Sequence, residues 1–153
     1  MIRQTRQLAI ALGLGLGLFA AMAHAQATPA GLWKTIDDES KKEKSLIRIT
    51  EAGGVFTGKL EKLLDPSSKP DAVCDLCSDD RKDKPIVGMT LIKNVKQSDS
   101  DKGRWDGGEI LDPNNGKTYK VRLTPGEGGK TLAVRGYIGA PMLGRTQTWV
   151  RVE

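Results

Sequence analysis

The two cysteines are the residues whose spacing most directly suggests chemistry. Cys74 and Cys77 form a C-x-x-C pair, and two thiols at this spacing can exchange a disulfide. Redox sites place the motif at the start of a helix after a strand, whereas here it lies in a polar segment between predicted strands. Zinc would need two further ligands, and residues 26–153 contain no other cysteine and no histidine. We predict a disulfide that holds a loop, with a thiol-redox role as the weaker alternative.

Aromatic and basic side chains could form a ligand site, because rings supply apolar walls and arginine binds carboxylate or phosphate. The candidate ligand-binding residues are Trp105, Tyr119, Arg135, Tyr137, Arg145 and Trp149. The alternative for the rings is packing in the core of a β-sheet domain. Period-two alternation puts Arg135 on one face with Ala133 and Tyr137. We expect that face to point outward, with an inward orientation as the alternative.

The N-terminal 25 residues have the pattern of a cleaved signal peptide. Arg3 and Arg6 precede an apolar run over residues 8–22, and Ala-His-Ala at residues 23–25 is a small-x-small cleavage site. Cleavage would lower the net charge by two, from +5 to +3, and would remove His24, the only histidine. We expect a periplasmic or secreted protein, with residues 26–153 forming one domain that has no transmembrane segment.

The loss of the histidine removes most familiar routes to catalysis. A Ser-His-Asp triad, a Cys-His pair and a histidine metal site all become impossible. The carboxylates at residues 37–39 and 79–80 fall in exposed-looking runs, and no phosphate-binding motif occurs outside the signal peptide. We therefore predict a protein that is not an enzyme and has no metal site or cofactor. The mild, interleaved charge gives no indication of nucleic-acid binding.

Hydrophobic periodicity after Gly31 is mostly two, which is typical of β-strands. The predicted strands cover residues 31–36, 45–51, 55–61, 86–93, 103–111, 118–123, 131–138 and 146–152. Residues 63–85 contain both cysteines and are predicted to form a long loop, in which a short helix is an alternative. The pattern favours a single antiparallel β-barrel of about eight strands with little helix, and a sandwich is the alternative.

Gly31 and Trp33 open the first predicted strand with a G-x-W motif, which resembles the first strand of lipocalin-like barrels. That resemblance implies a structural tryptophan that plugs the closed end of the barrel. It also implies an arginine from the last strand lying across the indole ring, for which Arg145 and Arg151 are the candidates.

An ordered series of motifs resembles a bacterial family called domain of unknown function 2147. The motifs are GLWKT at 31–35, RKDKPIVG at 81–88, WDGG at 105–108, DP at 112–113, GKTY at 116–119, LAVRGYIG at 132–139 and GRTQTW at 144–149. The resemblance implies a small exported protein with a lipocalin-like architecture. It supplies no catalytic residues.

Two hypotheses about function remain open from the sequence. The leading one is a non-catalytic periplasmic protein that binds a small, partly apolar ligand, which could be anionic. The alternative is a module that binds another cell-envelope protein, with a filled barrel and an exposed apolar patch or free sheet edge. The two differ in the barrel interior, which alternation alone leaves undecided.

Overall fold

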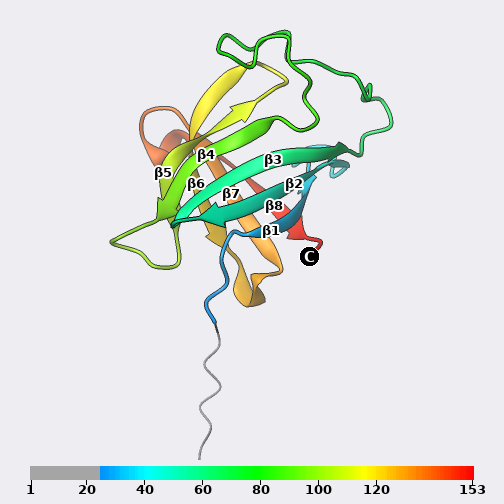
Figure 1. Ribbon diagram of the computed structural model, residues 1–153. Coiled ribbons are helices and arrows are strands. Elements are labelled where there is room, and N and C mark those ends of the chain that lie inside the picture. The colour runs from blue at the N-terminus through cyan, green and yellow to red at the C-terminus, as the bar shows by residue number, and fades with distance from the viewer. Residues whose placement is uncertain (1–24) are drawn as a thin grey trace, which may run out of the picture.

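The computed structural model describes residues 25–153, so the predicted signal peptide rests on residues outside this range. The strands form a closed antiparallel barrel in which each strand pairs with its neighbours in sequence and β8 returns to β1 (Figure 1). The strands are β1 Gly31–Ile36, β2 Glu43–Ala52, β3 Val55–Leu63, β4 Thr90–Gln97, β5 Trp105–Asp112, β6 Lys117–Pro125, β7 Thr131–Tyr137 and β8 Arg145–Arg151. The short 3₁₀ helices are η1 Glu127–Gly129 and η2 Pro141–Leu143. The predicted eight-stranded barrel is confirmed.

One predicted strand is misplaced. The sequence predicts a strand over residues 86–93, but β4 begins at Thr90. The backbone of residues 86–89 instead bonds outside the ladder: the Ile86 amide donates to Ala72 and the Gly88 amide donates to Leu60. Residues 64–89 form turns and one isolated bridge, without the short helix that the sequence left open.

The barrel has two different ends, because the chain runs up and down from strand to strand. The β2–β3, β4–β5 and β6–β7 connections lie at one end, and the other four connections lie at the opposite end (Figure 1). We call the first end, with the half of the barrel beneath it, the closed half. Its interior is filled by buried apolar side chains, namely Trp33, Ile49, Phe56, Val95, Trp105, Val121, Leu123 and Leu132. The rest of the interior is the open half.

Trp33 plugs the closed half. Its side chain is fully buried, and its indole N–H donates to the carbonyl of Pro29 over 2.7 Å. The guanidinium carbon of Arg151 lies 4.2 Å from the centre of the Trp33 ring, so the predicted arginine lid is Arg151. Arg151 also donates to the carbonyl of Ala30, and burial lowers its pKa. This one side chain therefore joins the last strand to the segment that enters the first.

The glycine of the G-x-W motif makes room for that lid. Gly31 has a φ of +142°, a conformation that residues with a side chain rarely adopt. A Cβ atom at this position would overlap the guanidinium of Arg151. Gly31 and Trp33 thus belong to one structural unit, which explains the motif by packing.

Candidate ligand-binding cavity

A cavity of about 800 Å³ occupies the open half of the barrel. All eight strands contribute to its wall, and the loop between β3 and β4 covers one side. Its volume falls in the range of small-molecule binding sites. The barrel is therefore filled at one end and hollow at the other.

The inner wall of the cavity is apolar. It is formed mainly by buried or half-buried aliphatic side chains and one indole: Ile47, Leu60, Leu91, Ile110, Val134 and Trp149. Leu60 alternates with the exposed Lys59 and Glu61, as β-strand geometry favours. By contrast, Leu91 and Ile110 are each followed by another aliphatic residue that is buried. The indole N–H of Trp149 donates to the side-chain oxygen of Gln147 over 3.2 Å. This part of the wall can accept an apolar group, and Gln147 adds a polar contact on the β8 side.

Three neutral polar residues lie on neighbouring strands at one side of the cavity. Thr35 of β1 and Ser45 of β2 are register partners, and their hydroxyl oxygens are 2.8 Å apart. Both residues are 7% exposed. Gln147 of β8 also lines the cavity, and β8 is the other neighbour of β1. We call Thr35, Ser45 and Gln147 the polar belt.

Charged side chains that line the cavity lie at its rim, and two of the cations are already paired. The Lys44 ammonium lies 2.5 Å from a carboxylate oxygen of Asp65. This hydrogen bond, with others from Ser67, holds the pKa of Asp65 well below its usual range, and the same pair raises the pKa of Lys44. Arg145 binds both carboxylate oxygens of Asp38, with its Nε 2.8 Å from one of them, and so lowers the pKa of Asp38.

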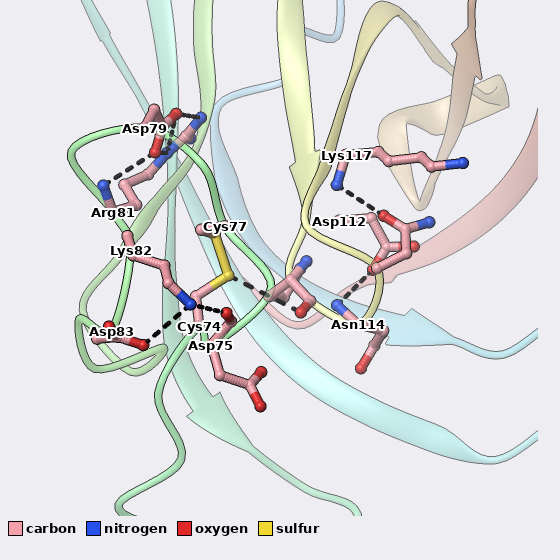
Figure 2. The surroundings of a disulfide bond; sticks show 12 residues. Cys74, Asp75, Cys77, Asp79, Arg81, Lys82, Asp83, Asp112, Asn114 and Lys117 are labelled. Carbon is pink, nitrogen blue, oxygen red and sulfur yellow. Dashed lines mark hydrogen bonds and ion pairs between the residues drawn. A yellow bond between two sulfur atoms is a disulfide. The ribbon is translucent and has the colours of Figure 1, made fainter.

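The loop that walls the cavity is held by the disulfide. Cys74 and Cys77 are bonded, with an S–S distance of 2.02 Å, and they are 0% and 3% exposed. Figure 2 shows the pair lying against the turn between β5 and β6, where Cys74 Sγ is 3.9 Å from the carbonyl oxygen of Pro113. A Cβ atom on Gly116 in that turn would overlap the backbone of Leu76. The predicted structural disulfide therefore docks the loop onto a neighbouring hairpin.

Arg81 fixes the far side of the same loop. Its guanidinium is buried and donates to the carboxylate of Asp79 through two nitrogens (Figure 2). It also donates to the Thr90 carbonyl over 2.9 Å. These hydrogen bonds lower the pKa of Asp79 to about 2. The loop is thereby attached to the first residue of β4, close to the cavity wall.

The structure brings four of the six predicted ligand-binding residues to the cavity. These residues are Tyr119, Tyr137, Arg145 and Trp149. Arg145 reaches the rim and pairs with Asp38, so it is not the lid on Trp33. The sequence pattern does not distinguish aromatic residues that line the cavity from those that fill the closed half, because both occupy alternating positions along strands.

Trp105 and Arg135 do not line the cavity. Trp105 starts β5 at the opposite end and packs edge-on against Phe56, with the ring centres 6.1 Å apart. Arg135 lies on the outer face, as alternation favours, and donates to the Pro141 carbonyl and the Thr146 hydroxyl, each over 2.7 Å. Its role here is to hold the connection between β7 and β8, so it offers no charge to the interior.

Sequence reasoning missed the polar belt and the contribution of the loop. Thr35 lies two residues after Trp33, so the alternation of β1 already placed it on the inner face. Ser45 then follows from strand pairing with Thr35. By contrast, no local pattern could indicate that Ile86 or Asp65 of the long loop would line the cavity.

Residues 25–153 contain neither a candidate metal site nor a membrane-spanning helix. Within residues 25–153, no group of three His, Cys, Asp or Glu side chains is arranged to hold a metal ion. No helix in this part of the chain has the length and apolar character needed to cross a membrane.

Comparison with known proteins gives a family and a fold. A family model described as "Uncharacterized protein conserved in bacteria (DUF2147)" matches residues 31–151. No curated protein sequence matches the chain. Among solved structures, protein HP1028 from the human pathogen Helicobacter pylori, which is described as belonging to the lipocalin family, is similar with a TM-score of 0.70. The two chains are 22% identical, and the alignment covers 83% of this chain and 84% of that chain. At this identity the similarity shows a shared lipocalin-like fold.

Proposed function

The chain belongs to the DUF2147 family of bacterial proteins, and we propose that it is a non-catalytic protein that binds a small, partly apolar ligand inside its barrel. The observation that carries the proposal is the cavity of about 800 Å³ in the open half. The closed half shows that this chain can fill a barrel interior with packed side chains. The cavity at the other end therefore results from the side chains placed there, and its apolar inner wall is suited to an apolar group.

An anionic group on the ligand would be held at the rim. Lys44 and Arg145 line the cavity there, but each already has a carboxylate partner. An incoming anion would either displace Asp65 or Asp38 from these pairs or meet Lys69, an exposed lysine of the loop that also lines the cavity. Such an exchange among half-exposed charges contributes little affinity, so the apolar interior supplies most of the binding energy.

The proposed location is the periplasm or the extracellular space. The signal-peptide pattern at residues 1–25 and the disulfide support this location, because disulfides persist in oxidising compartments. Fractionation of cells that express the full chain tests it. We expect a periplasmic or secreted species whose mass corresponds to residues 26–153, and an intact chain in the cytoplasm would contradict the proposal.

A partner protein in the cell envelope is the second candidate function, and one surface feature favours it. Ile138, Met142 and Leu143, in the connection between β7 and β8, are 63%, 82% and 76% exposed. Ile138 and Leu143 also line the cavity, so the exposed group borders its entrance. Because the described strands close into a ring, this patch is a more specific docking feature than any sheet edge.

A thiol-redox role has less support. Exchange requires attack on an accessible sulfur, and both cysteines are buried against the neighbouring hairpin. The pair serves the cavity indirectly, by holding the loop that forms part of its wall.

Fluorescence of N-phenyl-1-naphthylamine, a neutral apolar dye, tests ligand binding. We expect saturable binding to the purified protein and loss of binding in Gly136→Leu. Gly136 lines the cavity, and a Cβ atom there would make only ordinary contacts, the nearest at 3.6 Å, so the new side chain can extend into the space. Gly103→Leu in the exposed turn between β4 and β5 is the matched control. Absence of dye binding, or equal binding by Gly136→Leu, would refute the proposed function.

A further inference from the structure

We propose that the polar belt binds an uncharged hydrogen-bond acceptor of the ligand, so the ligand class is an amphiphile with an ester or amide carbonyl next to an apolar tail. The inference rests on the proposed function and specifies its ligand. The tail would lie against the apolar inner wall, and the carbonyl oxygen would meet Thr35, Ser45 and Gln147.

The hydroxyl pair leaves one donor free for a ligand. Thr35 and Ser45 are 2.8 Å apart, and either oxygen could be the donor. Each hydroxyl has one proton, so a bond between the two uses one proton and leaves the other. Both side chains line the cavity, so the remaining proton can be donated to a group inside it.

Gln147 supplies further donors on the next strand. Its side-chain oxygen accepts the indole N–H of Trp149, which fixes the orientation of the amide. The amide nitrogen carries two protons, and no acceptor for them is found among residues 25–153. Because β8, β1 and β2 are adjacent, these donors lie along one side of the cavity.

The opposite side of the cavity at this level is apolar, which makes the site directional. In this closed barrel β4 and β5 lie across from β8 and β1, and Leu91 of β4 and Ile110 of β5 line the cavity. A ligand oxygen turned toward this wall would lose its hydrogen bonds to water without replacement. A ligand therefore keeps its hydrogen bonds only when its polar atom faces β8, β1 and β2 and its apolar part faces the opposite wall.

The group that meets the belt should be neutral. No charged side chain belongs to the belt. Lys44 and Arg145 at the rim are paired with Asp65 and Asp38, and the third lysine or arginine of the lining, Lys69, is exposed on the loop. A carboxylate at the belt would lose its hydration, and only neutral hydroxyl and amide donors would compensate for its charge. An ester or amide carbonyl loses far less on leaving water and gains the same hydrogen bonds.

Competition among matched ligands tests the inference. Methyl octanoate, undecane, which has the same number of non-hydrogen atoms, and octanoate would each displace bound N-phenyl-1-naphthylamine. Undecane carries more apolar surface, so an ester without hydrogen bonds in the cavity would need a concentration at least about a hundredfold higher; with them, we expect the ester to come within about tenfold of undecane and to displace the dye below the concentration of octanoate. An ester weaker than undecane by about a hundredfold or more, or tighter binding of octanoate at neutral pH, would overturn the inference.

Removing the hydroxyls locates the effect. Thr35→Val with Ser45→Ala should weaken the ester roughly three- to tenfold, the loss of about one hydrogen bond, and leave undecane unchanged. Thr148→Val, at an exposed position of β8, is the control. Equal losses for ester and alkane would overturn the inference while leaving the proposed function intact. If the double variant did not fold, Ser45→Ala alone and the wild-type competition would still decide. Complete absence of dye binding would remove both proposals.

Discussion

The two halves of this barrel are made from the same eight strands, yet one is filled and the other is hollow. In the closed half, Trp33 is fully buried and Phe56 packs edge-on against Trp105. In the open half, Trp149 and aliphatic side chains line the wall around the cavity, and two inward positions carry the hydroxyls of Thr35 and Ser45. The packing of inward side chains across the barrel thus decides where the interior is core and where it is cavity.

The difference teaches where stability and binding reside. The side chains of the closed half fill its interior beneath the Arg151 lid, so a truncation there leaves a new void and costs more stability than one beside the existing cavity. The open half depends on the disulfide loop for part of its wall. Substitutions matched between the halves should therefore separate effects on stability from effects on ligand binding.

The largest expected contrast comes from truncating a leucine in each half. Leu123 is fully buried in the closed half, so Leu123→Ala should lower the free energy of unfolding by about 2–5 kcal/mol. Leu63 is half-buried beside the cavity, so Leu63→Ala should cost roughly 1 kcal/mol because it enlarges an existing space. Urea denaturation monitored by tryptophan fluorescence measures both values.

Dye binding should show the reverse order for the same pair. We expect Leu63→Ala to alter the affinity for N-phenyl-1-naphthylamine, and Leu123→Ala to leave it unchanged while the protein remains folded. Equal stability losses in the two halves would contradict the division into a core half and a binding half.

A second contrast compares two arginines of β8 that lie at opposite ends of the barrel. Arg151 covers Trp33 and donates to buried carbonyls, so Arg151→Met should lower the free energy of unfolding by about 2 kcal/mol. Arg145 is 59% exposed and pairs with Asp38, so Arg145→Met should cost less than about 1 kcal/mol.

Thermal denaturation of the two variants, with Arg151→Lys as a third, checks this expectation. Lysine keeps the charge but lacks the planar group that covers the ring, so it should recover little of the loss. Full recovery by lysine would mean that charge alone, and not the cover on Trp33, accounts for the effect.

Sequence patterns predicted the closed half better than the open half. Period-two alternation located seven of the eight strands, and the G-x-W motif indicated both Trp33 and an arginine lid. These features are local, or connect the first and last strands through a recognisable motif. Arg135 was also expected to point outward, as it does, because strand geometry fixes the face.

The open half depends on contacts that local patterns do not encode. Trp105 lies at the closed end because β5 starts there. The residue type of Trp105 does not indicate at which end of the barrel its strand starts. Similarly, Ile86 lines the cavity because its loop folds back, with the Ile86 amide bonded to Ala72 and the loop docked on the β5–β6 turn. Such long-range docking requires a three-dimensional structure.

The disulfide tests how far the open half depends on its loop. Replacing both Cys74 and Cys77 with serine should lower the free energy of unfolding by about 2 kcal/mol, since the bond closes a very short loop. Dye affinity should fall as well, because loop residues line the cavity. Chemical denaturation and dye titration of this variant, beside wild type with and without reductant, measure the two effects. Unchanged dye affinity in the folded variant would show that the loop holds its position without the disulfide.

The smallest expected effect concerns the ion pair at the far side of the same loop. Asp79 has a pKa of about 2 in the folded protein against an ordinary value of 3.8, because Arg81 binds its carboxylate. A lowered folded-state pKa means that the pair stabilises the protein fully above about pH 4, and that this contribution is lost as the pH falls toward 2. Because Asp79 is 42% exposed, solvent screening limits the contribution to less than about 1 kcal/mol.

Urea denaturation of wild type and Asp79→Asn at pH 6 and pH 3 should therefore show a difference in the free energy of unfolding that narrows at the lower pH. Asp80→Asn, at the exposed neighbouring carboxylate, is the matched control. A difference that widened on acidification would mean that Asp79 does not stabilise the loop through its charge, and that the hydrogen bond from Arg81 to Thr90 holds this side of the loop without it.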